Sequence, residues 1–363
     1  MHGNKKISRR MKPTHQIGKV NRAFLEKVIL SKLGAFRPEI LSRPKHGVDV
    51  GTIKICEDKI MVFSTDPLSI IPALGFKDSG WLSAHLLAND IATSGLPPAY
   101  ASLDFNLPPT IKDEEFKIYW EALIKEFEKL GVSVVSGHTG RYPGCGYSVI
   151  GAGTVIGVGE EDHYIDASMA RIGDSVIITK GIAIEATAVL AKSFPNTLKE
   201  KFGKTFLAKA QRTFRQCSAV EDALIASSVG VRDNGVTAIH DATEGGVYGG
   251  LAELASASSK GLRIEKKFIP LSKEAEKICS FFGLDPYSTL SSGTMIITVR
   301  PEKETDVVDA LKSKGITSAI IGKVIPREKG LHYIEEGAKK PIILPQEDLY
   351  WKAFWDASQK GWT

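Results

Sequence analysis

Apolar residues in this chain fall into short runs of strand length and longer stretches with helical spacing. Residues 60–66 form an apolar run that ends on Ser-Thr-Asp, which predicts a buried strand, and we expect Pro67 to stop it. Residues 79–94 repeat apolar side chains on one helical face, which predicts a helix with Ser79 as its cap and Gly95 at its end. Strand and helix therefore alternate from residue 60 onward.

The alternation continues through the first half of the chain. The pattern predicts strands near 99–105, 132–137 and 147–158 and a charged amphipathic helix at 113–130. Strands that alternate with helices are typical of an α/β (α+β) layer in which helices cover a sheet. The run 147–158 is apolar on both faces, so it needs cover either from its own helices or from a second copy of the chain.

A polar stretch at about 159–173 interrupts the pattern, and a second series of elements follows it. We expect a strand from Asp174, helices near 183–193 and 205–229, a strand at 236–240, a Gly-rich helix that opens at 244–250, a strand at 293–299, a helix at 302–314 and a strand at 318–325. With a boundary at 168, the chain divides into a basic tail at 1–14, domains at 15–168 and 169–345, and a C-terminal tail at 346–363 that docks as an amphipathic segment.

Length and composition agree with two globular domains. The chain has 363 residues, of which 43% are hydrophobic and 25% are charged. No stretch reaches about 18 consecutive apolar residues and the start has no apolar core, so we expect neither a membrane span nor a secretory signal. The four cysteines, at 56, 145, 217 and 279, lie too far apart for a CxxC zinc site or a disulfide framework, which favours the reducing cytoplasm.

The net charge of +5 is concentrated at the start of the chain. Seven basic residues precede Glu26, the first acidic residue: Lys5, Lys6, Arg9, Arg10, Lys12, Lys19 and Arg22. A basic arm of this kind either binds nucleic acid through counterion release or is a solvated tail. Because no aromatic residues lie between these charges, we expect a tail and no nucleic-acid partner.

The common nucleotide and hydrolase motifs are absent: there is no GxxxxGK[ST], no GxGxxG after a strand, no GxSxG and no HExxH. What remains is a set of acidic residues at the ends of predicted elements, namely Asp49, Asp66, Asp90 and Asp241. Carboxylates at strand ends meet at one edge of a sheet, and several together suit Mg²⁺, which usually arrives with phosphates. Each acid also has a plainer interpretation, as a turn former, an exposed helix residue or, for Asp241 and Glu244, a helix cap.

Two glycine-containing segments are candidates for binding the phosphates. In the loop 135–140, Gly137 permits close backbone approach and Thr139 can bond a phosphate or a metal-bound water. His138 in the same loop either neutralises phosphate or is a structural histidine. The segment 244–250 opens a helix with bare backbone amides, which is either an anion site or glycine used for close packing.

Five segments, taken in order, are similar to the motif series of the aminoimidazole ribonucleotide synthetase (PurM-like) superfamily: Gly47-Val-Asp-Val-Gly, Ser64-Thr-Asp, Asn89-Asp-Ile-Ala, Ser136-Gly-His-Thr and Asp241-Ala-Thr-Glu-Gly-Gly. This superfamily includes HypE-like hydrogenase maturation factors, selenophosphate synthetase and thiamine-monophosphate kinase. The resemblance covers residues 15–345, and Gly283-Leu-Asp-Pro, Ser291-Ser-Gly and Ile320-Ile-Gly-Lys-Val most resemble HypE-like proteins.

The resemblance implies a cytoplasmic enzyme that binds Mg²⁺–ATP and transfers or hydrolyses the γ-phosphate to activate a carbonyl or amide oxygen of an unknown acceptor, either a small molecule or a partner protein. The alternatives are a small-molecule kinase or synthetase of the thiamine-monophosphate kinase, selenophosphate synthetase or AIR synthetase type, and a nucleotide-binding scaffold without turnover. The implied fold has an N-terminal ATP-binding domain that forms a β-barrel by homodimerisation and a C-terminal α/β sandwich domain.

Carried over by motif, the site residues form three sets. The resemblance implies Asp49, Asp66, Asp90 and Asp241 as metal ligands, Asp66, His138 and Asp241 as catalytic residues, and Lys19, Thr65, Asn89, Gly137, Thr139 and Glu244 as ATP-binding residues. Catalysis of this type rests on positioning and charge neutralisation.

Two departures from the family pattern bear on the acceptor. His138 stands where HypE-like proteins and thiamine-monophosphate kinases commonly carry an acid, which would remove one metal ligand. The chain lacks the catalytic Cys or Sec of selenophosphate synthetase, and it ends on Thr363 where HypE carries the cysteine that it modifies. We therefore expect the protein to act on a diffusible acceptor or on a partner's group.

Overall fold

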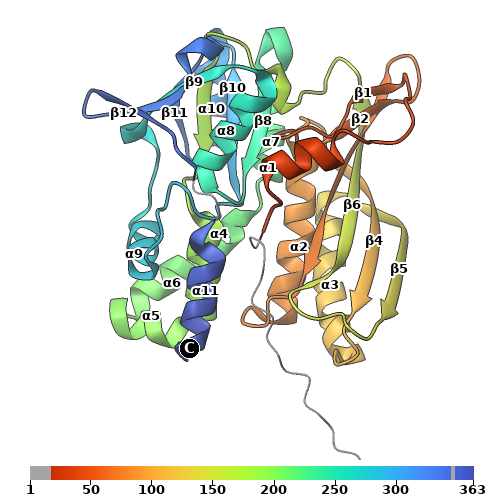
Figure 1. Ribbon diagram of the computed structural model, residues 1–363, viewed down its shortest axis with the longest axis vertical. Coiled ribbons are helices and arrows are strands. Elements are labelled where there is room, and N and C mark those ends of the chain that lie inside the picture. Colours follow the sequence, from red (N-terminus) through yellow and green to blue (C-terminus); the bar gives the residue numbers. More distant parts are fainter. Residues whose placement is uncertain (1–17, 345–347) are drawn as a thin grey trace, which may run out of the picture.

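The computed structural model describes residues 18–344 and 348–363. The whole of the predicted basic tail, residues 1–14 with Lys5, Lys6, Arg9, Arg10 and Lys12, lies outside the described residues. Within the described part, the strands form two sheets that stand side by side, with a group of helices below the second sheet (Figure 1). The mixed α/β architecture expected from the alternation of strands and helices is confirmed.

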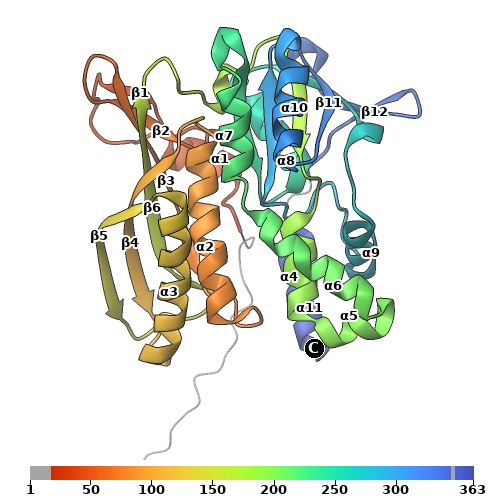
Figure 2. The ribbon, with the colours of Figure 1, turned by 180° about the vertical axis from the view of Figure 1, so that it is seen from behind.

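The first sheet, which we call the N-terminal sheet, has the strand order β1-β2-β3-β6-β4-β5. Its strands are β1 (Ile40–Ser42), β2 (Gly51–Lys54), β3 (Lys59–Ser69), β4 (Pro98–Leu107), β5 (Ser133–Arg141) and β6 (Val149–Glu160). Helices α2 (Gly75–Ala92) and α3 (Asp113–Leu130) cover one face, as Figure 2 shows. Buried residues such as Leu87, Ile91, Phe105 and Tyr119 form the core between these helices and the strands.

The other face of the N-terminal sheet is not covered by any described helix. Phe63 of β3 and Tyr100 of β4 both pair with Ile156 of β6, so the three side chains form a row across the sheet. Tyr100 is 43% exposed and Phe63 and Ile156 are partly exposed. We call this surface the open face.

The second sheet, the C-terminal sheet, has the strand order β13-β12-β9-β11-β7-β10-β8. Its strands are β7 (Ser175–Thr179), β8 (Val236–Ala242), β9 (Gly261–Glu265), β10 (Thr294–Val299), β11 (Ser318–Ile325), β12 (Leu331–Glu335) and β13 (Ala338–Pro341). Helix α8 (Gly246–Ser258) packs on one face, and α7 (Val220–Ser228) and α10 (Glu304–Ser313) pack on the other. Strands β7 and β10 and the edge strand β8 are buried along their whole length.

Five further helices form the group below this sheet: α4 (Ile184–Ser193), α5 (Pro195–Phe202), α6 (Lys204–Arg212), α9 (Lys273–Phe282) and α11 (Leu349–Gln359). Helix α11 buries Tyr350, Phe354 and Ala357 against this group. The expectation that the C-terminal segment docks on the body as an amphipathic element is therefore confirmed. The short α1 (Arg22–Phe24) and the helical turn Leu25–Ile29 precede β1.

Helix α2 also binds the two halves of the protein together. Asn89, which has no exposed surface, donates from Nδ2 to the carbonyl oxygen of Cys217 at 2.9 Å and accepts from the amide of Ala219 at 2.8 Å. Near the other end of the helix, Arg215 lies 4.4 Å from the ring of Trp81. These contacts fix the N-terminal sheet against the segment that leads into α7.

Three local expectations are wrong. Strand β3 passes through Pro67 to Ser69, because β2 pairs only with residues 60–63 and the missing N–H of Pro67 therefore faces no neighbouring strand. Ser79 lies inside α2 and not at its start, and its hydroxyl group accepts from the amide of Ile71. The single helix expected at 205–229 is broken between α6 and α7, where Asn89 takes the backbone groups of Cys217 and Ala219.

In the part of the chain that the structure describes, every helix is too short or too polar to cross a membrane.

Glu185, in the first turn of α4, predicts a pH dependence of stability. The residue is 5% exposed, and burial raises the pKa of its carboxyl group to about 7. Because this value lies above the ordinary one, the unfolded chain releases the proton first and stability falls as the pH rises from about 4.5 through 7. At about 1.4 kcal/mol per pKa unit, we expect Glu185→Gln to raise the free energy of unfolding by about 3 kcal/mol at pH 8 and by little at pH 4.5.

Urea denaturation of both proteins at the two pH values tests this expectation. An equal difference between wild type and variant at pH 4.5 and pH 8 would contradict it, because a pH-independent gain cannot come from ionisation of Glu185.

Candidate functional site

Acidic side chains from both sheets meet beside the C-terminal end of α2. Ser64 and Asp66 are alternate residues of β3 and point to the face that α2 covers, where Ser64 Oγ donates to Oδ2 of Asp90 at 2.6 Å. Asp241 of β8 comes from the C-terminal sheet and is 4% exposed. The charges of Asp66 and Asp241 both act on Asp90, which places the three carboxylates in one cluster.

Asp49 completes the cluster from the loop before β2. One ligand atom from each of Asp49, His240 and Asp241 lies within 4.8 Å of the others. The structure therefore brings together the four aspartates that the sequence pattern identified, although they are spread over nearly 200 positions of the chain. We call Asp49, Asp66, Asp90 and Asp241 the acidic cluster.

The pKa values of the cluster are shifted by burial and by mutual repulsion. Burial, together with the neighbouring charge of Asp49, raises the pKa of Asp66 to about 6 and that of Asp241 to about 7. Burial and the charges of Asp66 and Asp241 hold the pKa of Asp90 well above its ordinary value. Carboxylates that repel one another in this way are stabilised by a cation placed among them.

The donor set of the cluster fits a hard divalent cation. Its four aspartates offer only oxygen ligands, which suit Mg²⁺. His240 lies beside Asp49 and Asp241, and hydrogen bonds to Asp49 and Glu253 occupy both of its ring nitrogens. The residues present therefore agree with the expected Mg²⁺ and do not favour a softer metal.

Lys19 lies over the cluster from the N-terminal side. Its backbone amide donates to Glu244 at 2.8 Å, and its Nζ lies 3.3 Å from Thr243 Oγ1 and 3.5 Å from Glu253 Oε1. Burial acts to lower its pKa, but the charges of Glu253, Asp241 and Asp49 outweigh that effect and raise it. The side chain is still 59% exposed, so the ammonium group is charged and open to a ligand from the solvent.

Two residues near the cluster were missed by sequence reasoning, namely His240 and Glu253. His240 is 3% exposed, with Nδ1 2.8 Å from Asp49 Oδ2 and Nε2 3.0 Å from Glu253 Oε2. Burial opposes a charged ring, but the two carboxylates raise the pKa of His240 well above its ordinary value. Hydrogen bonding to His240 and the nearby Lys19 lower the pKa of Glu253 to about 2 despite its burial.

The start of α8 differs from the expected row of bare amides. Gly245 adopts a left-handed conformation, and its amide donates to Oδ2 of Asp348 at 3.0 Å. Glu244 accepts from the backbone of Lys19 and from Trp351 Nε1 at 3.4 Å. Protein carboxylates thus hold this end of the helix. A cavity of about 510 Å³ lies beside it, and its lining includes Lys19, Asn21, Arg22, His46, Asp49, His240, Gly249 and Glu253.

Several predicted site residues lie away from the acidic cluster within one chain. Thr65 is exposed on the open face, where its hydroxyl group shares a hydrogen bond with Thr154 at 2.8 Å. The loop expected at 135–140 is instead part of the edge strand β5, so that prediction is wrong. Gly137, His138 and Thr139 therefore lie three strands from β3, a separation of about 14 Å at the usual strand spacing. His138 is exposed and bonds with the hydroxyl group of Tyr142 at 2.7 Å.

Asn89 has a structural partner for each end of its amide. Its bonds to the backbone of Cys217 and Ala219 occupy both the oxygen and the nitrogen, and the residue is fully buried. Asn89 therefore connects the two halves of the protein, and it does not line the cavity beside α8.

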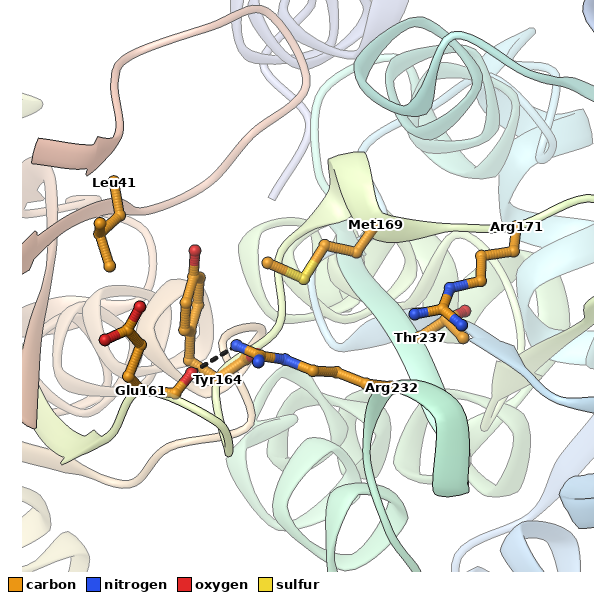
Figure 3. Close-up of a pocket in the computed structure, with 7 residues that line it drawn as sticks. All are labelled: Leu41, Glu161, Tyr164, Met169, Arg171, Arg232 and Thr237. Atoms are coloured by element: carbon orange, nitrogen blue, oxygen red, sulfur yellow. Dashed lines mark hydrogen bonds between the residues drawn. The ribbon is translucent and has the colours of Figure 1, made fainter. Parts of the chain in front are cut away.

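A second cavity, of about 530 Å³, lies beside the segment that joins the two sheets (Figure 3). Its lining consists of Leu41, Glu161, Tyr164, Met169, Arg171, Arg232 and Thr237. Arg232 Nε donates to the carbonyl oxygen of Tyr164 at 3.0 Å, and its guanidinium group lies 5.1 Å from the Tyr164 ring. Thr237 donates to Asp174 at 2.6 Å. The charged groups of Glu161, Arg171 and Arg232 all have partners inside the protein, which makes this cavity part of the contact between the two halves.

No cysteine lies in the acidic cluster among the described residues. Cys217 and Cys279 are buried, and burial raises the pKa of both thiols. Cys56 is exposed in the turn between β2 and β3, and Cys145 lies in the loop between β5 and β6. The chain therefore offers no reactive thiol at the candidate site.

Comparison with protein families finds two matches that follow one another along the chain. Residues 47–158 match the AIR synthase related protein, N-terminal domain, and residues 171–334 match the AIR synthase related protein, C-terminal domain. The first match contains Asp49, Asp66 and Asp90, and the second contains Asp241. The acidic cluster thus lies where the two matched regions meet.

Curated relatives and solved structures agree with these matches. The carbamoyl dehydratase HypE of Rhizobium leguminosarum bv. viciae is 28% identical over 274 residues, which cover 73% of each protein. HypE of Escherichia coli K12 is 27% identical over 81% of this chain and 84% of its own. The crystal structure of E. coli HypE has a TM-score of 0.67 at 26% identity and covers 78% of this chain and 85% of that one. A structure of HypE in complex with ATP shares the fold, with a TM-score of 0.65 at 21% identity.

Proposed function

The chain belongs to the AIR synthase related (PurM-like) family, and we propose that it is an ATP-dependent enzyme of the HypE type. The observation that carries this proposal is the acidic cluster beside Lys19. Two of its carboxylates come from the region of the N-terminal sheet, one from the end of α2 and one from β8. Such an arrangement suits a triphosphate that brings its own divalent cation. Relatives named carbamoyl dehydratase support ATP-dependent chemistry on an amide-type group.

In this proposal, the residues of the chain bind and orient the nucleotide. Asp49, Asp66, Asp90 and Asp241 would hold Mg²⁺, which supplies positive charge to the phosphates when it is bound. Lys19 would neutralise a phosphate oxygen, because its ammonium group is exposed and stands among the carboxylates. With little covalent work left for the protein, the rate enhancement would come from positioning and charge neutralisation.

The acceptor in this proposal is a carbonyl or amide oxygen supplied by another molecule. The buried thiols of Cys217 and Cys279 cannot carry it, and the other two cysteines lie in turns of the N-terminal sheet away from the cluster. A relative of the same fold has been crystallised as a HypE–HypF complex, so a partner protein is one candidate source of the acceptor.

The second candidate function is a small-molecule kinase, favoured by the wide cavity beside Lys19 and Gly249. The two differ in where the phosphate ends. A dehydratase releases free phosphate in step with ADP, whereas a kinase leaves the phosphoryl group on the acceptor. Measurement of ADP, free phosphate and acceptor mass with Mg²⁺–ATP and either carboxamide acceptors or thiamine monophosphate separates them. Nucleotide binding without release of ADP under any of these conditions would favour the scaffold alternative.

We also propose that the protein is a homodimer that buries the open face. The row of Phe63, Ile156 and Tyr100 is apolar and lacks a covering helix. Dimerisation through this face would also allow the Gly137–Thr139 segment of one copy to lie near the acidic cluster of the other copy. Within one chain, this segment is three strands away from β3.

Ile156→Asp is expected to turn the dimer into a monomer at micromolar concentration, because an unpaired carboxylate buried at the centre of an apolar interface costs several kcal/mol. Sedimentation velocity measures the change. Ile118→Asp is a matched control, since Ile118 is 47% exposed on α3, on the opposite side of the sheet. A wild-type monomer, or a dimer that survives Ile156→Asp, would contradict this proposal.

A further inference from the structure

His240 lies at the junction between the two sheets. It belongs to β8, and its ring reaches both Asp49, in the loop before β2, and Glu253 of α8. Carboxylates only accept hydrogen bonds, so both ring nitrogens donate, at 2.8 Å to Asp49 and at 3.0 Å to Glu253. The ring therefore connects one member of the acidic cluster to a helix of the other half.

The loop that carries Asp49 depends on contacts with α8 for its position. Gly47 has a positive φ of +80°, and a side chain there would meet the carbonyl oxygen of Glu253 at 2.4 Å. Lys45 Nζ donates to the carbonyl oxygen of Ala257 one turn further along. The loop is thus packed directly on the helix backbone, and within the described residues His240 is the side chain that hydrogen-bonds with the Asp49 carboxylate.

Glu253 stabilises the arrangement from the other side. Its carboxylate is 13% exposed and accepts from His240 through Oε2, while Oε1 lies 3.5 Å from Lys19 Nζ. Glu253 is the one charged residue of an otherwise apolar and small-residue helix. A buried charge at such a place needs partners, and His240 and Lys19 provide them.

We propose that His240 is a positioning residue that fixes the carboxylate of Asp49 for the metal–nucleotide complex and is itself oriented by Glu253. The inference rests on the proposed function, in which Asp49 helps to hold Mg²⁺. His240 is not itself a ligand in this arrangement, because hydrogen bonds to two carboxylates occupy both of its ring nitrogens. Removing an outer partner of a metal ligand typically costs about 10–100-fold in metal affinity or activity.

Two substitutions at this position separate positioning from simple packing. The side-chain amide of asparagine can take the place of Nδ1 and still donate to Asp49, whereas that of glutamine takes the place of Nε2 and points to Glu253. We therefore expect His240→Gln to raise the Mg²⁺ concentration needed for half-maximal binding of a non-hydrolysable ATP analogue by about 10–100-fold. His240→Asn should stay much closer to wild type.

Calorimetric titration of the analogue at a series of Mg²⁺ concentrations gives this midpoint, and ATP turnover gives the separate effects on kcat and KM. Glu253→Ala provides a second route and should shift the midpoint in the same direction as His240→Gln. His85→Asn is the matched control, because His85 is also a buried histidine beside a glutamate. Its partner, at 3.3 Å, is Glu126 of α3, and no hydrogen bond joins it to the acidic cluster among the described residues.

An unchanged Mg²⁺ midpoint in His240→Gln would overturn the positioning role. So would an equal shift of the midpoint in the Gln and Asn variants that correlates with a fall in their melting temperatures. A wild-type protein that binds no ATP analogue with Mg²⁺ would refute the proposed function itself, and this inference with it. The two failures are therefore told apart by the wild-type titration.

Discussion

Asp66→Asn is expected to lower Mg²⁺-dependent ATP hydrolysis by at least about 100-fold while the protein remains folded. Asp66 stands on β3 among three other carboxylates, and its pKa is raised to about 6 by burial and by neighbouring acids. The asparagine amide has nearly the same shape, so no cavity opens, but one negative charge is lost from the cation site. Because the lost charge is one of several that repel each other, the free energy of unfolding without Mg²⁺ should stay the same or increase.

The measurement pairs ATP turnover with denaturation of the same samples. Asp58→Asn is a suitable control, since Asp58 is an exposed aspartate in the turn that leads into the same strand. Wild-type nucleotide affinity in a folded Asp66→Asn protein would place the site elsewhere. A large loss of stability would instead assign Asp66 a structural role.

Much of the fold was predictable because local signals and long-range packing agree. Helix α3 begins and ends where its pattern predicts, since the backbone amide of Lys112 is capped by Glu115 and Gly131 takes the left-handed conformation at the end. The buried strands β7 and β10 are mainly apolar runs. In these elements, the residues of the segment itself are enough to predict its secondary structure.

The failures occur where a distant residue decides the local structure. Pro67 is tolerated in β3 only because β2 is too short to pair beside it. The helix expected at 205–229 is broken where the side chain of Asn89 satisfies the backbone at Cys217 and Ala219. Neither event is visible in the segment itself, because the deciding partner lies in another element.

The candidate site shows the same division. Aspartates at element ends pointed to the acidic cluster, and the structure brings all four together. His240 and Glu253 were missed because each was considered only as part of an apolar element. A usable signal existed for both: His240 is a polar residue late in a buried strand, and Glu253 is the lone charge in α8. Buried polar residues need hydrogen-bond partners, and here the partners Asp49 and Lys19 belong to the candidate site.

Asn89→Ala is expected to lower the free energy of unfolding by about 2–4 kcal/mol, because it leaves two buried backbone groups without partners. The carbonyl oxygen of Cys217 and the amide of Ala219 both depend on the Asn89 side chain, at 2.9 Å and 2.8 Å. The family resemblance implies a nucleotide-binding residue at this position. The geometry instead predicts a loss of stability that exceeds any direct loss of nucleotide affinity.

Urea denaturation and ATP-analogue titration, both at a temperature where the variant is folded, separate these two roles. Asn106→Ala is the matched control, since Asn106 lies on β4 and donates to the nearby Asp104 without bridging the two halves. If Asn89→Ala loses nucleotide affinity while its unfolding midpoint equals that of wild type, Asn89 is a ligand. If the midpoint falls and the affinity of the folded fraction remains, nucleotide binding at the acidic cluster does not require the Asn89 amide. The function of Asn89 is then to hold α2 against the segment before α7.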